Sequence, residues 1–84
     1  MRFTASSRFL RTARTLPEPQ RAMLRAAIRR FAVDPHDPLL RTQKLKGDLA
    51  AYWAFTVDGD LRVLVRWEGE DAFLVNLGSH DQVY

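Results

Sequence analysis

Hydrophobic and polar positions follow two different periods along this chain. Between residues 6 and 33 apolar side chains recur at the three- and four-residue spacing of amphipathic helices, whereas from residue 50 onward they alternate with polar side chains as in strands. Helices gathered before an antiparallel meander predict an α+β fold in which a helical pair covers one face of a small sheet. No repeat interrupts the pattern, so we expect one domain over residues 1–84.

The N-terminal half predicts a short edge strand followed by a helical hairpin. Residues 2–5 suit the strand, and Ser6 or Ser7 can cap a first helix that Pro17-Glu18-Pro19 ends. A second helix begins at these prolines and stops at Asp34-Pro35-His36-Asp37-Pro38, because the residue before each proline is pushed out of the helical region. Its apolar stripe consists of Leu24, Ala27, Ile28, Phe31 and Ala32.

Three strands account for the C-terminal half. They cover residues 52–57, 61–67 and 72–77, and are separated by Asp58-Gly59 and Glu68-Gly69-Glu70, which are typical of hairpin turns. With the N-terminal strand they give the element order β-α-α-β-β-β. Alternation predicts one shared face in each strand, made of Trp53, Phe55 and Val57 in the first, Leu61, Val63, Val65 and Trp67 in the second, and Phe73, Val75 and Leu77 in the third.

The second face of this sheet is predicted to be polar and uncovered. It would present Arg62 and Arg66 beside Tyr52 and Thr56. An arginine in the middle of a strand is costly to bury, so it usually points to water or to an anionic ligand. We therefore expect this face to be available for binding.

Composition narrows the classes of function. With 84 residues, 46% hydrophobic and 27% charged, the chain suits one layered core and excludes a multidomain enzyme with a separate cofactor lobe. It has no cysteine and two histidines, so disulfides and thiolate metal sites are excluded and we expect neither a metal nor another cofactor. No apolar run approaches the roughly 18 residues of a membrane span, and no secretory signal is visible, which favours a cytoplasmic protein without membrane contact.

Charge is distributed unevenly along the chain. Residues 1–47 carry eleven basic and three acidic side chains, a net charge of +8, whereas residues 48–84 carry two basic and seven acidic ones, a net charge of −5. A basic helical layer is typical of a surface that binds a polyanion or an acidic protein partner. Solvent-exposed helix faces rich in arginine would give the same pattern without any binding function. Eleven of the thirteen basic residues are arginine, whose planar fork favours bidentate contacts with phosphate or carboxylate.

An ordered set of short motifs resembles a known family. The chain resembles the RelE/ParE superfamily of bacterial toxins from type II toxin–antitoxin modules, over nearly its whole length. The tail looks most like the branch around RelE and YafQ, whose members cut messenger RNA on the ribosome and are neutralised by an antitoxin. The motifs are Lys44-Leu45-Lys46-Gly47-Asp48, Tyr52-Trp53, Leu61-Arg62-Val63-Leu64-Val65 and Gly78-Ser79-His80-Asp81-Gln82-Val83-Tyr84.

The resemblance implies four catalytic candidates. Relatives use no metal; a ribose 2′-hydroxyl attacks the adjacent phosphate, which requires a base, an acid and positive charge on the phosphoryl oxygens. Arg62 matches the strand arginine placed on that phosphate, and His80 matches a tail histidine that can transfer protons. Tyr84 matches a terminal aromatic residue that orients a nucleotide, and Asp60 matches an acid that orders the substrate or the base.

The same resemblance implies the partners, namely ribosome, messenger RNA and a cognate antitoxin in a heteromeric complex. Lys44, Lys46, Arg41 and Arg66 are the candidate RNA contacts. An ordinary loop with two lysines, or a cross-strand charge at Arg66, would explain these residues equally simply.

Departures from the family pattern leave other functions open. The lysines of RelE fall on Trp53 and Phe55, and the histidines of YafQ-like members fall on Gln43 and Thr56, so the general base is unassigned. Two alternatives therefore stand beside the ribonuclease. One is a non-enzymatic toxin like ParE, which poisons DNA gyrase, and the other is a degenerate member that only binds its antitoxin.

Overall fold

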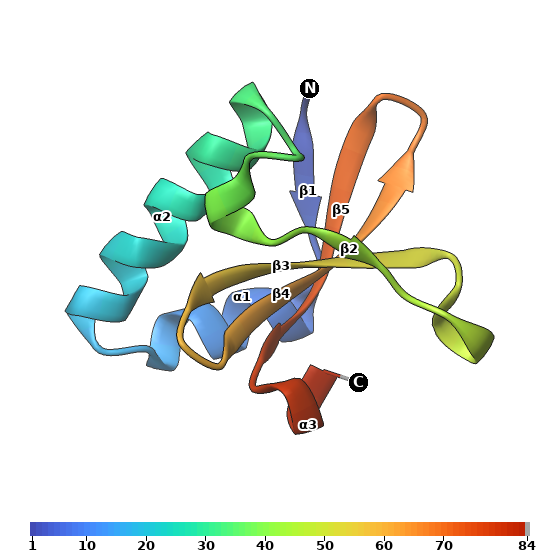
Figure 1. The fold of residues 1–84 in the computed structure, drawn as a ribbon. Coiled ribbons are helices and arrows are strands. Elements are labelled where there is room, and N and C mark those ends of the chain that lie inside the picture. Colours follow the sequence, from blue (N-terminus) through green and yellow to red (C-terminus); the bar gives the residue numbers. More distant parts are fainter. Residues whose placement is uncertain (84) are drawn as a thin grey trace.

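The computed structural model describes residues 1–83 and contains a five-stranded sheet with the order β1-β5-β4-β3-β2 (Figure 1). The edge strand β1 runs parallel to β5, and all other neighbours are antiparallel. The predicted α+β meander is confirmed, whereas the two-residue strand β2 and a C-terminal helix were not predicted. The strands are β1 (Phe3–Ala5), β2 (Gln43–Lys44), β3 (Tyr52–Asp58), β4 (Leu61–Glu68) and β5 (Asp71–Gly78).

The helical hairpin consists of α1 (Ser7–Thr15) and α2 (Glu18–Val33). Ser6 caps α1, because its Oγ accepts a hydrogen bond from the Phe9 N–H at 2.9 Å. The same hydroxyl donates to the Val75 carbonyl oxygen at 2.6 Å and so fixes the start of α1 to β5. Within residues 1–83, no helix combines the length and the hydrophobicity that a bilayer crossing needs.

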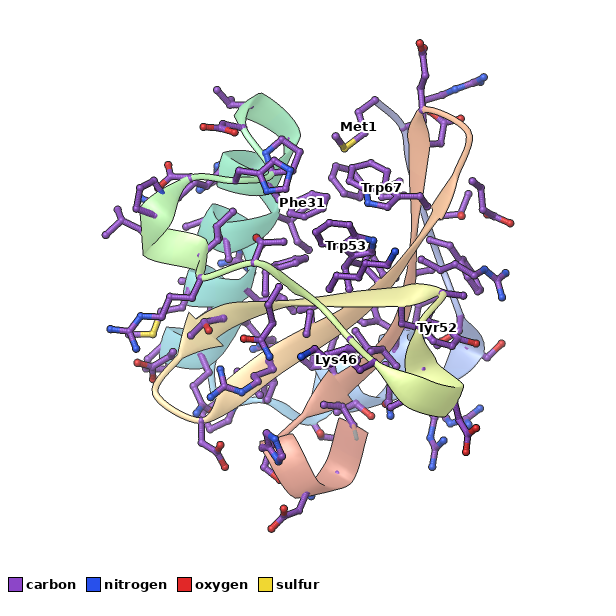
Figure 2. The ribbon with its side chains drawn as sticks, turned by 45° about the vertical axis from the view of Figure 1, so that its right-hand side comes forward. Met1, Phe31, Lys46, Tyr52, Trp53 and Trp67 are labelled. Atoms are coloured by element: carbon purple, nitrogen blue, oxygen red, sulfur yellow. The ribbon has the colours of Figure 1, made fainter. Side chains whose placement is uncertain are left out.

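The main core lies between the helices and one face of the sheet. Phe31 of α2 is fully buried, with ring centroids 4.7 Å from Phe55 and 5.5 Å from Trp67. Figure 2 shows Phe31, Trp53 and Trp67 on one side of β3, with Tyr52 on the other. The predicted faces of β3 and β4 are therefore confirmed. The buried members are Phe9, Leu24, Ala27, Phe31, Leu40, Phe55, Val63, Val65, Ala72, Leu74 and Leu77.

The second face of the sheet is partly covered, which corrects the expectation that it is open. Leu45, Ala54, Leu64 and Val83 form a smaller buried cluster over its middle. Val83 comes from the short helix α3 (His80–Val83), and Leu45 precedes a turn of 3₁₀ helix, η2 (Gly47–Leu49). Since Leu64 stands between Arg62 and Arg66 on β4, this cluster separates the two arginines.

The predicted face of β5 is right at Leu77 but wrong at Phe73 and Val75. Phe73 pairs with Arg66 of β4, whose guanidinium lies over its ring, so Phe73 is on the second face of the sheet. Leu74 and Leu77 both face the main core, whereas Val75 joins the smaller cluster. The physical reason is a bulge: Leu64 pairs with Asn76 while Val65 pairs with Leu74, which leaves Val75 without an opposite residue. One extra residue reverses the faces of the strand after it.

Candidate active site

A pocket of about 210 Å³ opens at the β2 end of the sheet's second face. Its lining residues come from the loop before β2 and from β2 itself, from the consecutive strands β3 and β4, and from α3. Its floor is Ala54 and Phe55, and its polar lining is Arg41, Gln43, Thr56, Arg62 and His80. Three predicted site residues, Arg41, Arg62 and His80, therefore meet in one place.

Arg62 is held by the strand opposite to it. In the register of the sheet Arg62 of β4 pairs with Thr56 of β3, and its Nη1 donates a hydrogen bond to Thr56 Oγ1 at 2.9 Å. The side chain is partly buried, so the guanidinium has a defined direction and retains donors that face the pocket. This geometry suits a phosphate or carboxylate ligand.

His80 is the first residue of α3, and the ends of that helix are fixed by their neighbours. Ser79 and Gln82 form a capping box: Gln82 Oε1 accepts from the Ser79 N–H at 2.8 Å, and Ser79 Oγ accepts from the Gln82 N–H at 3.3 Å. At Gly78 a Cβ atom would lie only 2.7 Å from Gln82 Oε1, so glycine leaves room for this side chain. Val83 is buried in the smaller cluster and fixes the other end.

This helix was not predicted, although serine followed three residues later by glutamine is a recognisable capping signature. The Gly-Ser-His-Asp-Gln-Val run is therefore a structural unit that presents His80 at the pocket rim. Gln82 was not among the predicted site residues; it does not line this pocket, and it forms the capping box from which α3 begins at His80.

Asp60 contributes to the placement of His80. It lies in the turn between β3 and β4, and its Oδ1 accepts a long hydrogen bond of 3.5 Å from the His80 N–H. No ion pair joins Asp60 to Arg62, so the described part of the chain offers no salt bridge as an explanation for Arg62. His80 Nδ1 lies 3.6 Å from Asp81 Oδ1 on the solvent side.

The remaining candidates are divided between two places. Lys44 and Lys46 line a second hollow of about 300 Å³ that shares Gln43 and His80 with the first. Arg66 lies elsewhere: its guanidinium carbon is 5.1 Å from the centre of the Phe73 ring, and its Nη2 is 3.6 Å from Glu68. Tyr84 lies outside the described residues.

The electrostatics of the pocket favour an anion. Among the described residues that line it, two are arginines, one is a histidine and none is acidic. Neither Arg41 nor Arg62 forms an ion pair with an acid of residues 1–83, whereas Arg21, Arg25 and Arg30 of α2 do. The same part of the chain contains no group of three or more His, Cys, Asp or Glu side chains placed to hold a metal ion.

Comparison with known proteins identifies the fold. No protein-family model matches the sequence, and no curated protein matches it. Among solved structures, a YoeB/ParE toxin from Agrobacterium tumefaciens has a TM-score of 0.83 at 19% identity, covering 95% of this chain and 99% of its own. The RelB-RelE antitoxin-toxin complex from Methanococcus jannaschii gives 0.74 at 15% identity, covering 100% and 95%. The DinJ-YafQ complex from E. coli gives 0.69 at 14% identity, covering 100% and 99%.

These three structures share the fold of RelE/ParE toxins with this chain over nearly its full length. The resemblance inferred from the motifs is thereby confirmed at the level of the fold.

Proposed function

We propose that this chain is the toxin of a type II toxin–antitoxin module and cleaves messenger RNA on the translating ribosome. The observation that carries the proposal is the single pocket that contains Arg62, His80 and Arg41 with no acid in its lining. A pocket of this charge suits a phosphodiester, and an imidazole at its rim can accept or donate a proton.

The proposed reaction is metal-free transesterification. The 2′-oxygen forms a bond to the adjacent phosphorus while the bond from phosphorus to the 5′-oxygen breaks, which leaves a cyclic phosphate and a 5′-hydroxyl. The 2′-hydroxyl proton goes to a base, and a proton is delivered to the leaving 5′-oxygen. Arg62 binds the phosphoryl oxygens, where negative charge accumulates in the transition state. Asp60 fixes the His80 backbone, and Tyr84 is proposed to orient the nucleotide.

His80 is the described pocket residue that can exchange a proton, because neither Gln43 nor Thr56 titrates in the usual range. The pH dependence of the cleavage rate distinguishes its two possible roles. If His80 is the base, activity is lost as pH falls and the imidazole becomes charged. If it is the acid, activity is lost as pH rises.

Basic side chains beside the pocket support an RNA track. Lys44 and Lys46 line the adjoining hollow, and Arg41 lines the pocket itself. Phosphate contacts of this kind make binding fall steeply with salt concentration. Arg66, beyond the smaller cluster, would contact a more distant phosphate.

The proposed regulator is an antitoxin that binds the toxin in the cytoplasm. The matched RelE and YafQ structures contain RelB and DinJ chains, which supports a heteromeric complex for this protein too. An antitoxin segment could add a helix in a groove or a strand at a free sheet edge.

Mapping of messenger RNA 5′ ends after induced expression in a bacterial host tests the proposal. We expect cuts within translated frames, lost in Arg62→Ala and His80→Ala proteins at matched abundance. Val33→Ala, at an exposed position 87% accessible on α2, is the control that keeps the cuts.

Two other outcomes would replace the proposal. Growth arrest without cuts, unchanged by His80→Ala, favours a gyrase inhibitor like ParE. Neither arrest nor cuts would leave a protein that binds only its antitoxin.

A further inference from the structure

Arg41 has a backbone conformation that L-residues rarely adopt. It ends the 3₁₀ helix η1 (Pro38–Leu40) with φ 49° and ψ 42°, and its N–H donates to the Pro38 carbonyl oxygen at 3.3 Å. Among residues 1–83 it is the only non-glycine residue with positive φ; the others are Gly47, Gly59 and Gly69. A glycine would end this helix without the clash that a Cβ atom causes.

The next residue adds a second unfavourable feature. The Thr42 hydroxyl oxygen is buried and has no hydrogen-bond partner within residues 1–83. Unsatisfied buried polar atoms are rare in folded proteins, and locally unfavourable features gather at functional sites. Two consecutive costs at the pocket rim indicate that the segment is shaped by something other than stability.

The pocket shows what Arg41 contributes. Arg41 lines the same cavity of about 210 Å³ as Arg62, and no acid among the described lining residues balances the two charges. Two cations beside one cavity repel each other, and an anion bound between them removes that repulsion. Glycine at position 41 would remove the strain of a positive φ from the backbone, but it would also remove one of these cations.

We propose that Arg41 is a second phosphate-binding arginine, held in the left-handed region so that it and Arg62 bind the same RNA phosphodiester. The inference rests on the proposed ribonuclease function and adds a catalytic residue to it. During attack by the 2′-oxygen the phosphoryl oxygens gain negative charge, so a second guanidinium binds the transition state more strongly than the substrate. Arg41 should therefore act mainly on kcat.

Thermal unfolding of the isolated protein with inorganic phosphate tests the pair of arginines without any ribosome. Phosphate should raise the Tm of the wild-type protein by mass action, and Arg41→Gly should lose most of that rise. Without phosphate, Arg41→Gly should unfold at the same temperature or higher, because the strain is gone. Arg14→Ala removes one exposed charge from α1 and should respond to phosphate as the wild type does.

An equal phosphate response in wild type and Arg41→Gly would overturn the proposal. So would a lower Tm of Arg41→Gly without phosphate, because the left-handed conformation would then carry no strain.

RNA cleavage by ribosomes programmed with a defined message gives the second readout. We expect Arg41→Gly and Arg41→Asn, which both tolerate positive φ, to lower kcat about 10- to 100-fold with KM changed less than about threefold. A raised KM with unchanged kcat would place Arg41 on a neighbouring phosphate and overturn the proposal. If the wild type cleaves nothing, the ribonuclease function fails, while the phosphate titration still tests the two arginines.

Discussion

The two faces of the sheet use the same strands for different purposes. On β4, Val63 and Val65 point into the main core and are fully buried, while Arg62 and Arg66 point the other way. The helix-covered face is continuous and apolar, whereas the second face has a small cluster around Leu64 with charged sites on either side. Concentrating the apolar packing on one face leaves the other free to keep arginines that a core would exclude.

The largest expected effect is on the helix-covered face. Phe31→Ala removes a fully buried ring that stacks on two others, and should lower the free energy of unfolding by about 3–5 kcal/mol, measured by urea denaturation. Val33→Ala, exposed on the same helix, should change it by less than about 0.5 kcal/mol. Equal losses of unfolding free energy in Phe31→Ala and Val33→Ala would contradict a core centred on Phe31. If Phe31→Ala does not fold, the milder variant Phe31→Leu allows the same measurement.

A smaller effect is expected from the cluster on the second face. Leu64→Ala should cost about 2–3 kcal/mol, because Leu64 is buried in a small cluster with Leu45, Ala54 and Val83 rather than in the main core. The same change removes packing around Val83 of α3, which carries His80. The rate of RNA cleavage should therefore fall by more than the loss of folded protein accounts for. A variant with lowered stability but normal cleavage at a temperature where it is folded would show that the cluster does not position His80.

The faces of β3 and β4 and the ends of the two helices are the features that the sequence predicts well. In β4 a shift of one residue would turn Arg62 and Arg66 into the core, so the face that carries Arg62 was predictable; β3 follows the same period of two. The helices were predictable because Ser6 and the prolines mark their ends and the stripe through Phe31 marks their inner side.

The errors lie where local pattern does not determine structure. The bulge at Val75 depends on pairing with β4, which no periodicity within β5 reveals. The short strand β2 exists only because β3 offers it hydrogen bonds. The division of the second face by Leu45 and Val83 joins segments separated by 38 positions in the sequence, and local motifs carry no information about such contacts.

The third prediction concerns the capping box of α3. Gln82→Ala removes the acceptor for the Ser79 N–H and should lower the free energy of unfolding by about 1 kcal/mol. His80 would then sample other positions, so kcat for RNA cleavage should fall. Gln82→Glu keeps an acceptor oxygen at the same place and should restore most of both properties. If alanine and glutamate give the same kcat, the box has no part in placing His80.

The smallest effect should come from the outer surface of α2, where arginines are paired with an acid. Arg25 Nη2 donates to Glu18 Oε1 at 2.8 Å and Arg21 Nη2 lies 3.0 Å from Oε2. The hydrogen bond from Arg25 and the charges of both arginines hold the pKa of Glu18 below its ordinary value. A carboxyl whose pKa is lower in the folded protein adds stability above its unfolded pKa of about 4.3 and loses it as pH falls through the folded value.

Urea denaturation of Glu18→Gln between pH 3 and pH 7 checks this expectation. The variant should be slightly less stable than wild type at pH 7, and the difference should shrink as pH falls, because the wild-type carboxyl then becomes protonated. Arg14→Gln is the matched comparison: Arg14 is exposed on α1 and has no ion pair with an acid of residues 1–83, so its stability difference from wild type should stay constant across the same range. A difference for Glu18→Gln that is independent of pH would contradict the pairing on α2. An equally pH-dependent difference for Arg14→Gln would mean that the pH response comes from the overall charge of the helices, and the distinction between paired and unpaired arginines would fail.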